Sequence, residues 1–418
     1  MEDVYPFPED MLLDSQRLMA RQRRLGFDVI RSNPNICGYN LTGMLDHALT
    51  GEGPWTFWRE WKPAIMEALQ DGWAPLRWCL FAEPMHVYAG RPIRLEAVLA
   101  NEDVLRHGEY PAHFRVMGPA GIVWEQKASA IIRKAPAGEY APFAVPVLTE
   151  EARLSGPSGA YTFTANLEHG GGPFGRSLKF YVSDAAALPR PGQTVQLWGI
   201  EEKTRGWLES HGVHCEPFND SAKQNNPLIV VGNRTEKDSN RWQELARQIA
   251  LGGVAIFLSP QAFQRDQDPV GWLLLEKKGR VYRFNDWLYH KECVAKPHPI
   301  FEGLPIRGIM DGDYCGSVVP EYLFDGQETS DDIAAAAFAV GYPIPGGYAS
   351  GLLIASYPLG EGRFILNTCK ILENLEVNPV AGRLLLNMIS YAAQLARKQK
   401  AECSSNLDDT LRRIAYAQ

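Results

Sequence analysis

The chain has 418 residues, of which 22% are charged and 45% are hydrophobic, and its formal net charge is -7. This length predicts about two or three domains rather than one core. The negative balance argues against a nucleic-acid partner, because phosphates attract clustered Lys and Arg. The densest basic run, RQRR at 21–24, is better interpreted as the solvated face of a helix.

The seven cysteines are scattered and form no CxxC pair. This pattern predicts neither a zinc site nor a disulfide framework, and reduced thiols are the simplest interpretation. The start, MEDVYPFPED, lacks the apolar stretch of a signal peptide, and no later run is long enough to span a bilayer. We therefore expect a cytoplasmic protein with no membrane partner, no metal and no cofactor.

The first 75 residues combine a helix, a strand-like run and an aromatic loop. Residues 9–30 carry apolar side chains at helical spacing, and a turn at 32–35 leads into a strand-like run, Ile36–Leu45. A loop and a short helix from Pro63 to about Gln70 follow; the loop is rich in aromatic residues, Trp55, Phe57, Trp58 and Trp61. Strand, loop and helix in this order are typical of one βα unit of a (β/α)8 barrel. Residues 1–75 are therefore predicted to be a partial barrel, its terminal βα unit.

Residues 76–188 show a different pattern. Short runs of alternating apolar and polar residues are separated by Gly, Pro, Asn and Asp at intervals of about eight to twelve residues. The runs are HVYAG, IRLEAVLAN, AHFRVMG, GIVWEQKAS, FAVPVL, GAYTFTANLEHGG and RSLKFYVS. This pattern predicts an antiparallel β-sandwich. The segment AAALPRPG, residues 185–192, is a candidate linker.

In residues 189–400, strands and helices alternate. Apolar runs suited to buried parallel strands occur at 194–200, 227–233 and 254–260, and helical patterns occur at 204–212 and 239–253. A hairpin around 360–362 and a closing helix at 378–400 follow. Alternation of this kind predicts a doubly wound, flavodoxin-like α/β domain. The tail, 401–418, is polar and expected to fray. The predicted fold class is thus multidomain, α/β plus all-β.

Two families are similar to parts of this chain. Residues 10–185 resemble the C-terminal part of glycoside hydrolase family 2, the β-galactosidase and β-glucuronidase group, through NPNICGYNLTGMLDH, GEGPWTFWREWKP and ALQDGWAPLRWCLFAEP. Residues 193–397 resemble the class I glutamine amidotransferase-like fold that some of these proteins append, through PLIVVGN, GGVAIFLSP, HPIFEGLP and PLGEGRFILNTCKILENLEVNPVAGRLLLNMISYA. The resemblance implies a carbohydrate-active protein: the end of a barrel, a sandwich and an appended domain.

Glycoside hydrolysis by the retaining route needs two carboxylic acids, one as proton donor and one as nucleophile. In the resembled family these are glutamates at the ends of the fourth and seventh barrel strands, and this chain begins after both positions. Glu2 and Glu9 follow no predicted strand. No catalytic residue is therefore assigned, and the chain is interpreted as a truncated or split glycosidase, with a partner chain or self-association completing the barrel. The exposed flank of residues 10–75 should then be apolar.

Six residues are candidates for binding a carbohydrate. Asp46 and His47 end the strand-like run and would either hydrogen-bond sugar hydroxyls or cap the loop behind them. Trp55, the preferred stacking candidate, and Trp58 offer flat rings for sugar faces, although packing at the junction with the sandwich is the simpler interpretation for most of these aromatics. Arg59 and Glu60 are possible polar partners of the sugar.

Two other functions are alternatives to a glycosidase. A non-enzymatic carbohydrate-binding or protein-interaction module would use the same aromatic loop. An active amidotransferase-like hydrolase would need a cysteine on a G-x-C-x-G turn, which is absent. Ser259-Pro260 follows the corresponding strand, and Pro lacks a donor that an oxyanion hole would use. Cys293, His298 and Cys315 are accordingly interpreted as structural.

Overall fold

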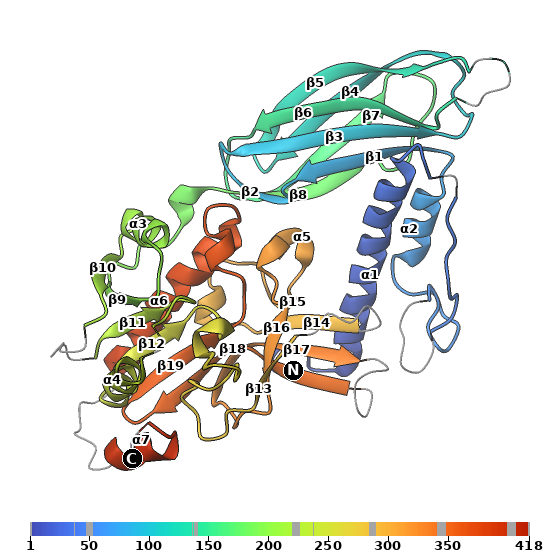
Figure 1. Ribbon diagram of the computed structural model, residues 1–418. Helices are drawn as coiled ribbons and strands as arrows, with labels where there is room; N and C mark the ends of the chain where they lie inside the picture. Colours follow the sequence, from blue (N-terminus) through green and yellow to red (C-terminus); the bar gives the residue numbers. More distant parts are fainter. Residues whose placement is uncertain are drawn as a thin grey trace. The chain divides into compact units, whose positions relative to one another are not determined.

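The computed structural model describes residues 2–36, 38–46, 53–135, 137, 141–219, 226–236, 238–283, 290–340, 348–398 and 407–416. The fold is mixed α/β with strands in several sheets (Figure 1). The chain forms two compact units. The sandwich unit comprises Phe7–Ala187 and Asp311–Gly316; the α/β unit comprises Met1–Pro6, Leu188–Met310 and Ser317–Gln418.

The sandwich unit contains two sheets around one core. The first is antiparallel, with the order β1 (Leu76–Glu83), β3 (Pro92–Asn101), β6 (Ala144–Arg153). The second has the order β2 (His86–Tyr88), β8 (Ser177–Ser183), β7 (Gly159–Leu167), β4 (Gly108–Gly118), β5 (Gly121–Ile132), and only the β2–β8 pair is parallel. Alternate side chains of both sheets are buried in this core, where Trp78 of β1 packs edge-to-face on Phe114 of β4 at 5.4 Å. Each run predicted as a strand from 86 to 183 overlaps a strand of this unit.

Two helices precede the sandwich in the same unit. They are α1 (Pro8–Arg31), which begins with a proline in its first turn, and α2 (Ile65–Gly72). Ala20 and Phe27 of α1 form a small core with Ile65 and Leu69 of α2. A further short helix, α5 (Gly312–Cys315), also belongs to this unit.

The strand predicted over Ile36–Leu45 is wrong for the residues that the structure describes there. Residues 38–43 have no regular secondary structure, and Leu45 makes an isolated bridge to Trp55. The physical reason is that a strand is stabilised by hydrogen bonds to neighbouring strands, and here the backbone pairing is confined to residues 44–46. The apolar pattern of this run is therefore not sufficient to make a strand.

The α/β unit is built on one large sheet. Its parallel part has the order β10 (His214–Pro217), β9 (Thr194–Trp198), β11 (Leu228–Val231), β12 (Val254–Phe257), β19 (Gly362–Asn367). The sheet continues with antiparallel strands β18 (Tyr348–Leu359), β17 (Asp332–Val340), β14 (His290–Ala295) and β15 (Gly308–Ile309). A side pair, β13 (Arg280–Arg283) and β16 (Tyr322–Asp325), joins at β18. The sequence pattern predicts the β18–β19 hairpin but not the strands from β13 to β17.

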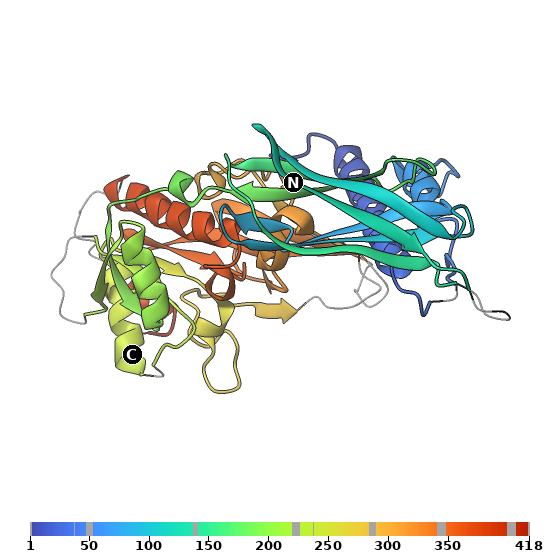
Figure 2. The same ribbon diagram turned by 90° about the horizontal axis from the view of Figure 1, so that it is seen from above.

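Helices cover both faces of the parallel strands. The first of these helices is α3 (Glu202–Ser210), which connects β9 to β10. The others are α4 (Ser239–Ala250), α6 (Pro379–Lys398) and α7 (Leu407–Arg413). Figures 1 and 2 show α6 on the face of the sheet opposite to α4. Trp242 of α4 is fully buried and stacks on Trp272 with ring centroids 5.4 Å apart. Burial on both faces explains why these strands are continuous apolar runs.

The C-terminal segment differs from the predicted frayed tail. Residues 407–413 form α7, and Leu411, Ile414 and Tyr416 are buried in the core beside α4. Their burial stabilises the segment in a way that its polar composition does not reveal. Residues 401–406 lie outside the described residues. Within the described chain, no helix combines the length and apolar character needed to cross a membrane.

Candidate functional site

The aromatic loop of the sandwich unit is a compact hairpin, residues 53–62, which we call the aromatic hairpin. The Asp46 amide donates to the Trp55 carbonyl at 3.0 Å, and the Trp55 amide donates to the Met44 carbonyl at 3.1 Å. Trp55 also bridges to Trp61, and a tight turn between Thr56 and Glu60 closes the tip. These bonds fix the backbone on which the loop aromatics are carried.

The Asp46 side chain anchors this hairpin through two interactions. Its Oδ1 atom accepts from the Gly53 amide at 2.9 Å and from Lys62 Nζ at 2.8 Å. The Lys62 side chain is only 2% exposed, and burial lowers its pKa although the Asp46 carboxylate acts in the opposite direction. Asp46 therefore acts as a structural anchor here, which agrees with the capping interpretation. Its partner in sequence, His47, lies outside the described residues.

The aromatic side chains divide into buried and exposed ones. Trp55 is partly buried, packs edge-to-face on Trp61 at 5.0 Å, and its Nε1 has no hydrogen-bond partner among the described residues. By contrast, Trp58 is 74% exposed, Phe57 61% and Trp61 46%. The rings available to a ligand are thus Phe57, Trp58 and Trp61, whereas Trp55 supports them.

The two polar candidates lie at the tip beside Trp58. Arg59 has a left-handed backbone, with φ 64°, and its amide donates to the Thr56 carbonyl at 2.9 Å. Glu60 closes the turn through its backbone, and both side chains are exposed. The structure thus brings Trp58, Arg59 and Glu60 together on one turn at the tip of the hairpin. Sequence reasoning missed Lys62, because a single lysine beside an aromatic run carries no recognisable signal.

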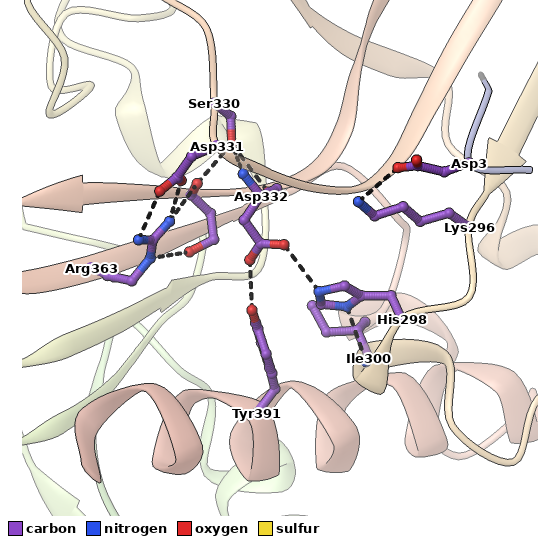
Figure 3. Close-up of polar contacts among 10 residues, drawn as sticks. Asp3, Lys296, His298, Ile300, Ser330, Asp331, Asp332, Arg363 and Tyr391 are labelled. Carbon is purple, nitrogen blue, oxygen red and sulfur yellow. Dashed lines mark hydrogen bonds and ion pairs between the residues drawn. The ribbon is translucent and has the colours of Figure 1, made fainter. Parts of the chain in front are cut away.

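The α/β unit offers a second polar cluster, which bears on the amidotransferase alternative (Figure 3). His298 Nδ1 accepts from the Ile300 amide at 3.3 Å, and its Nε2 lies 3.2 Å from Asp332 Oδ1. Tyr391 donates to Asp332 Oδ2 at 2.6 Å. Burial alone would raise the pKa of Asp332, but the bonds from His298 and Tyr391 outweigh it and hold that pKa below its usual value. Both nitrogens of His298 are occupied, so the ring orders the loop and is not free to act as a base.

Ser259, Cys293 and Cys315, the candidate positions for a nucleophile, have structural roles as well. Ser259 caps a short 3-10 helix, its Oγ accepting from the Gln261 amide at 3.2 Å. Cys293 lies in β14 and is 6% exposed, and Cys315 is fully buried. Across the described ranges, no three His, Cys, Asp or Glu side chains are placed to hold one metal ion.

No protein-family profile and no curated protein sequence matches this chain. Three solved structures are similar to parts of this chain. The Pseudomonas fluorescens alkylpurine DNA glycosylase AlkC has 12% identity and a TM-score of 0.19, over 29% of this chain and 36% of that one. A Paenibacillus cycloisomaltooligosaccharide glucanotransferase has 14% identity and a TM-score of 0.20, over 43% and 27%. The CARDB domain of a Pyrococcus furiosus protein has 16% identity and a TM-score of 0.18, over 26% and 87%.

Proposed function

We propose that this chain is part of a carbohydrate-active protein of the glycoside hydrolase family 2 type, and that the aromatic hairpin is its saccharide-contacting surface. One observation carries the proposal: Phe57, Trp58 and Trp61 are exposed on a turn that the buried Asp46–Lys62 pair holds in place. Exposed aromatic rings are favoured where they bind a partner, and sugar rings present flat apolar faces that suit them. A fixed turn also reduces the entropy lost on binding.

The finer fold assignments belong to the same proposal. The parallel strands run in the order β10-β9-β11-β12-β19, which in chain order is second, first, third, fourth, fifth. This order supports a flavodoxin-like interpretation of the α/β unit. For residues 8–72, the proposal of a barrel end rests on the resemblance alone, because the strand expected between α1 and α2 is not formed in the described residues.

Binding is tested by isothermal titration against a panel of oligosaccharides. We expect at least one sugar to bind, and Trp58→Ala to weaken that binding about two- to tenfold, since one aromatic contact contributes about 0.5–1.5 kcal/mol. Trp58→Phe should retain most of the affinity because it keeps a ring. Trp73→Ala is the matched control: Trp73 is 47% exposed in the same unit but packs on Phe27 outside the hairpin. The proposal fails if no sugar binds, or if Trp73→Ala weakens binding as much.

A second candidate function is interaction with another polypeptide. Eleven of the eighteen exposed large hydrophobic side chains of the described chain lie within residues 7–73. They are Phe7, Leu12, Leu13, Val29, Tyr39, Met44, Phe57, Trp58, Trp61, Met66 and Trp73. Such a concentration is typical of an interface. We infer that some of these side chains are covered by a second polypeptide, and a second copy of the chain is the form that we test.

Self-association is measured by sedimentation across a range of protein concentrations. We expect concentration-dependent dimers or larger species, and we expect the double variant Leu12→Glu, Val29→Lys to remain monomeric. Both positions are exposed, so the variant should still fold. A wild-type chain that stays monomeric at about 100 μM, where an association with a micromolar Kd would be nearly complete, contradicts self-association.

A further inference from the structure

The parallel strands of the α/β unit reverse their order between β9 and β11 (Figure 1). From β9 the chain passes through α3 to β10 on one side, whereas from β11 it passes through α4 to β12 on the other side. Because the two connections run in opposite directions, they open a crevice beyond the carboxyl ends of the two strands, and ligands of open α/β sheets bind in such a crevice. A small-molecule site in this unit is therefore expected at this edge.

A cavity of about 290 Å³ occupies this position. Its lining comes from Gly199 and Ile200, just after β9, from Asn233, just after β11, from Trp207 of α3, and from the segment 372–377, between β19 and α6. Segments distant in the chain thus meet at the carboxyl edge of the sheet. A volume of this size holds one small organic molecule.

The backbone beside the cavity is fixed by the close approach of two loops. The Gly232 amide donates to the Trp198 carbonyl at 2.8 Å, and the Arg234 amide donates to the Gly199 carbonyl at 3.3 Å. A Cβ atom on Gly232 would lie 2.2 Å from the Gly199 carbonyl oxygen, and Gly199 has a left-handed backbone with φ 67°. Glycine permits both the approach and this conformation without strain. The cavity is therefore preformed, which lowers the cost of binding a ligand.

Apolar side chains form much of the lining. Trp207 contributes a partly buried indole ring, which stacks on His211 with ring centroids 4.0 Å apart and is thereby held in place. Ile200, Leu372 and Leu375 add aliphatic surface. An aromatic ring bound beside the indole would bury flat apolar area on both partners. This composition favours a ligand that contains an aromatic ring over one that is hydroxylated all round.

The charged side chains of the lining disfavour an anion. They are the carboxylates of Glu201, Glu373 and Glu376, against the single ammonium of Lys203. Lys203 lies 2.8 Å from Glu376, and Glu201 lies 2.6 Å from Arg234, so these charges are already balanced. The Glu373 carboxylate is exposed and can accept from hydroxyl groups, whereas it would repel a phosphate. The lining therefore fits an uncharged ligand with hydroxyl donors.

We propose that this cavity binds a ribonucleoside, with its base beside Trp207 and its vicinal hydroxyls toward the Glu373 carboxylate. The site lies in the α/β unit and does not depend on the saccharide proposal for the aromatic hairpin. Isothermal titration of the full chain with adenosine, guanosine, cytidine and uridine tests it, and we expect at least one of them to bind. For the tightest, the 2′-deoxy form should bind about two- to tenfold more weakly, because one hydroxyl contact is lost. The 5′-monophosphate should bind about threefold more weakly or worse, because the phosphate meets carboxylates.

Two substituted positions locate the binding. Trp207→Ala should weaken ribonucleoside binding at least about fivefold through the lost stacking, and Trp207→Phe should retain most of the affinity. Glu373→Gln should weaken the ribonucleoside about two- to tenfold and affect its 2′-deoxy form less, because the deoxy form already lacks one donor. The matched control is Glu276→Gln, at an exposed glutamate of the same unit outside the cavity lining, which should change neither affinity.

Absence of binding by all of the ribonucleosides would overturn the proposal, and so would a 5′-monophosphate that binds as tightly as its ribonucleoside. Undiminished binding by a folded Trp207→Ala variant, with folding checked by circular dichroism, would place the ligand outside this cavity. An equal effect of Glu276→Gln and Glu373→Gln would likewise contradict a ribose contact at Glu373.

Discussion

Lys62 Nζ lies 2.8 Å from Asp46 Oδ1, and the two side chains are only 2% and 15% exposed. This buried ion pair joins Asp46, which lies upstream of the aromatic hairpin, to Lys62 at the hairpin's end. The rings of the hairpin therefore depend, for their position, on a charge pair that no ligand needs to touch. The pair has consequences for stability that can be measured.

Asp46→Ala should destabilise the sandwich unit by about 3–5 kcal/mol, because it leaves the buried Lys62 ammonium without a counter-charge. The double variant Asp46→Ala, Lys62→Met should recover much of that loss, since neither charge then remains buried. Urea unfolding followed by tryptophan fluorescence measures both changes. An unfolding curve for Asp46→Ala that overlays the wild-type curve would show that the pair does not anchor the hairpin.

Asp28 should make the stability of the sandwich unit depend on pH. Burial raises the pKa of its carboxyl from 3.8 to about 7, even though Arg77 lies 2.8 Å away. Between these two values the folded chain holds a proton that the unfolded chain has lost, so this group's contribution falls as pH rises from about 4 to 7. The total change is at most about 4 kcal/mol, at 1.36 kcal/mol per pKa unit.

The variant Asp28→Asn lacks this titration. We expect the free energy of unfolding of the wild type, relative to Asp28→Asn, to decrease steadily between pH 4 and 7. Asp14→Asn, at an exposed carboxylate of the same helix, is the control and should follow the wild type. A constant difference between wild type and Asp28→Asn over this range would mean that the Asp28 carboxyl is already ionised at pH 4.

The buried thiols should resist alkylation. Burial raises the pKa of Cys79 to about 12 and that of Cys215 to about 11. Since the thiolate is the reactive form, labelling by iodoacetamide at pH 7.5 should be slow in the native state. The experiment uses a Cys37→Ser, Cys403→Ser background, so that the thiols measured are the five that the structure describes.

In that background, labelling of Cys215 should accelerate as pH rises toward 11, and unfolding in urea should release all five thiols. Rapid labelling of one native thiol at pH 7.5, with loss of a hydrolytic activity, is the contrary outcome. It would support the amidotransferase-like alternative, which requires a thiol of lowered pKa.

The C-terminal segment should stabilise the α/β unit. Tyr416 donates its hydroxyl to the Trp272 carbonyl at 2.6 Å, and Leu411 and Ile414 are buried nearby. Tyr416→Phe should cost about 1 kcal/mol through the lost hydrogen bond. Tyr416→Ala should cost about 3–5 kcal/mol, because it also empties a packed site. Chemical denaturation measures both, and equal losses for the two variants would show that ring packing contributes nothing.

The strands of the sandwich were predictable because the alternation of buried and exposed residues has the period of a strand. In β3, Ile93, Leu95, Ala97 and Leu99 are all fully buried. Strand β1 was missed because almost all its residues are buried, which removes the alternation. The strands from β13 to β17 were missed because they interrupt the expected alternation of strand and helix between β12 and β19.

The sequence predicted which residues belong to the aromatic loop, but not which of their side chains are exposed. The loop and its aromatic residues could be identified, yet Trp55, the preferred stacking residue, proved to be the partly buried one, and Trp58 is the more exposed. Which ring of a crowded loop turns outward depends on the pairing of Trp55 with residues 44–46, and that pairing spans the loop rather than neighbouring positions.

By itself, the sequence determined the periodic elements: the alternating strands, the buried parallel strands and the amphipathic helices, each of which depends on neighbours within a few residues. The tertiary structure alone decided that the run before Asp46 stays irregular, that Lys62 closes the hairpin and that the loops after β9 and β11 meet beside one cavity. Each of these outcomes depends on hydrogen bonds or charges between segments distant in the chain, and local residue patterns carry no information about which segments meet.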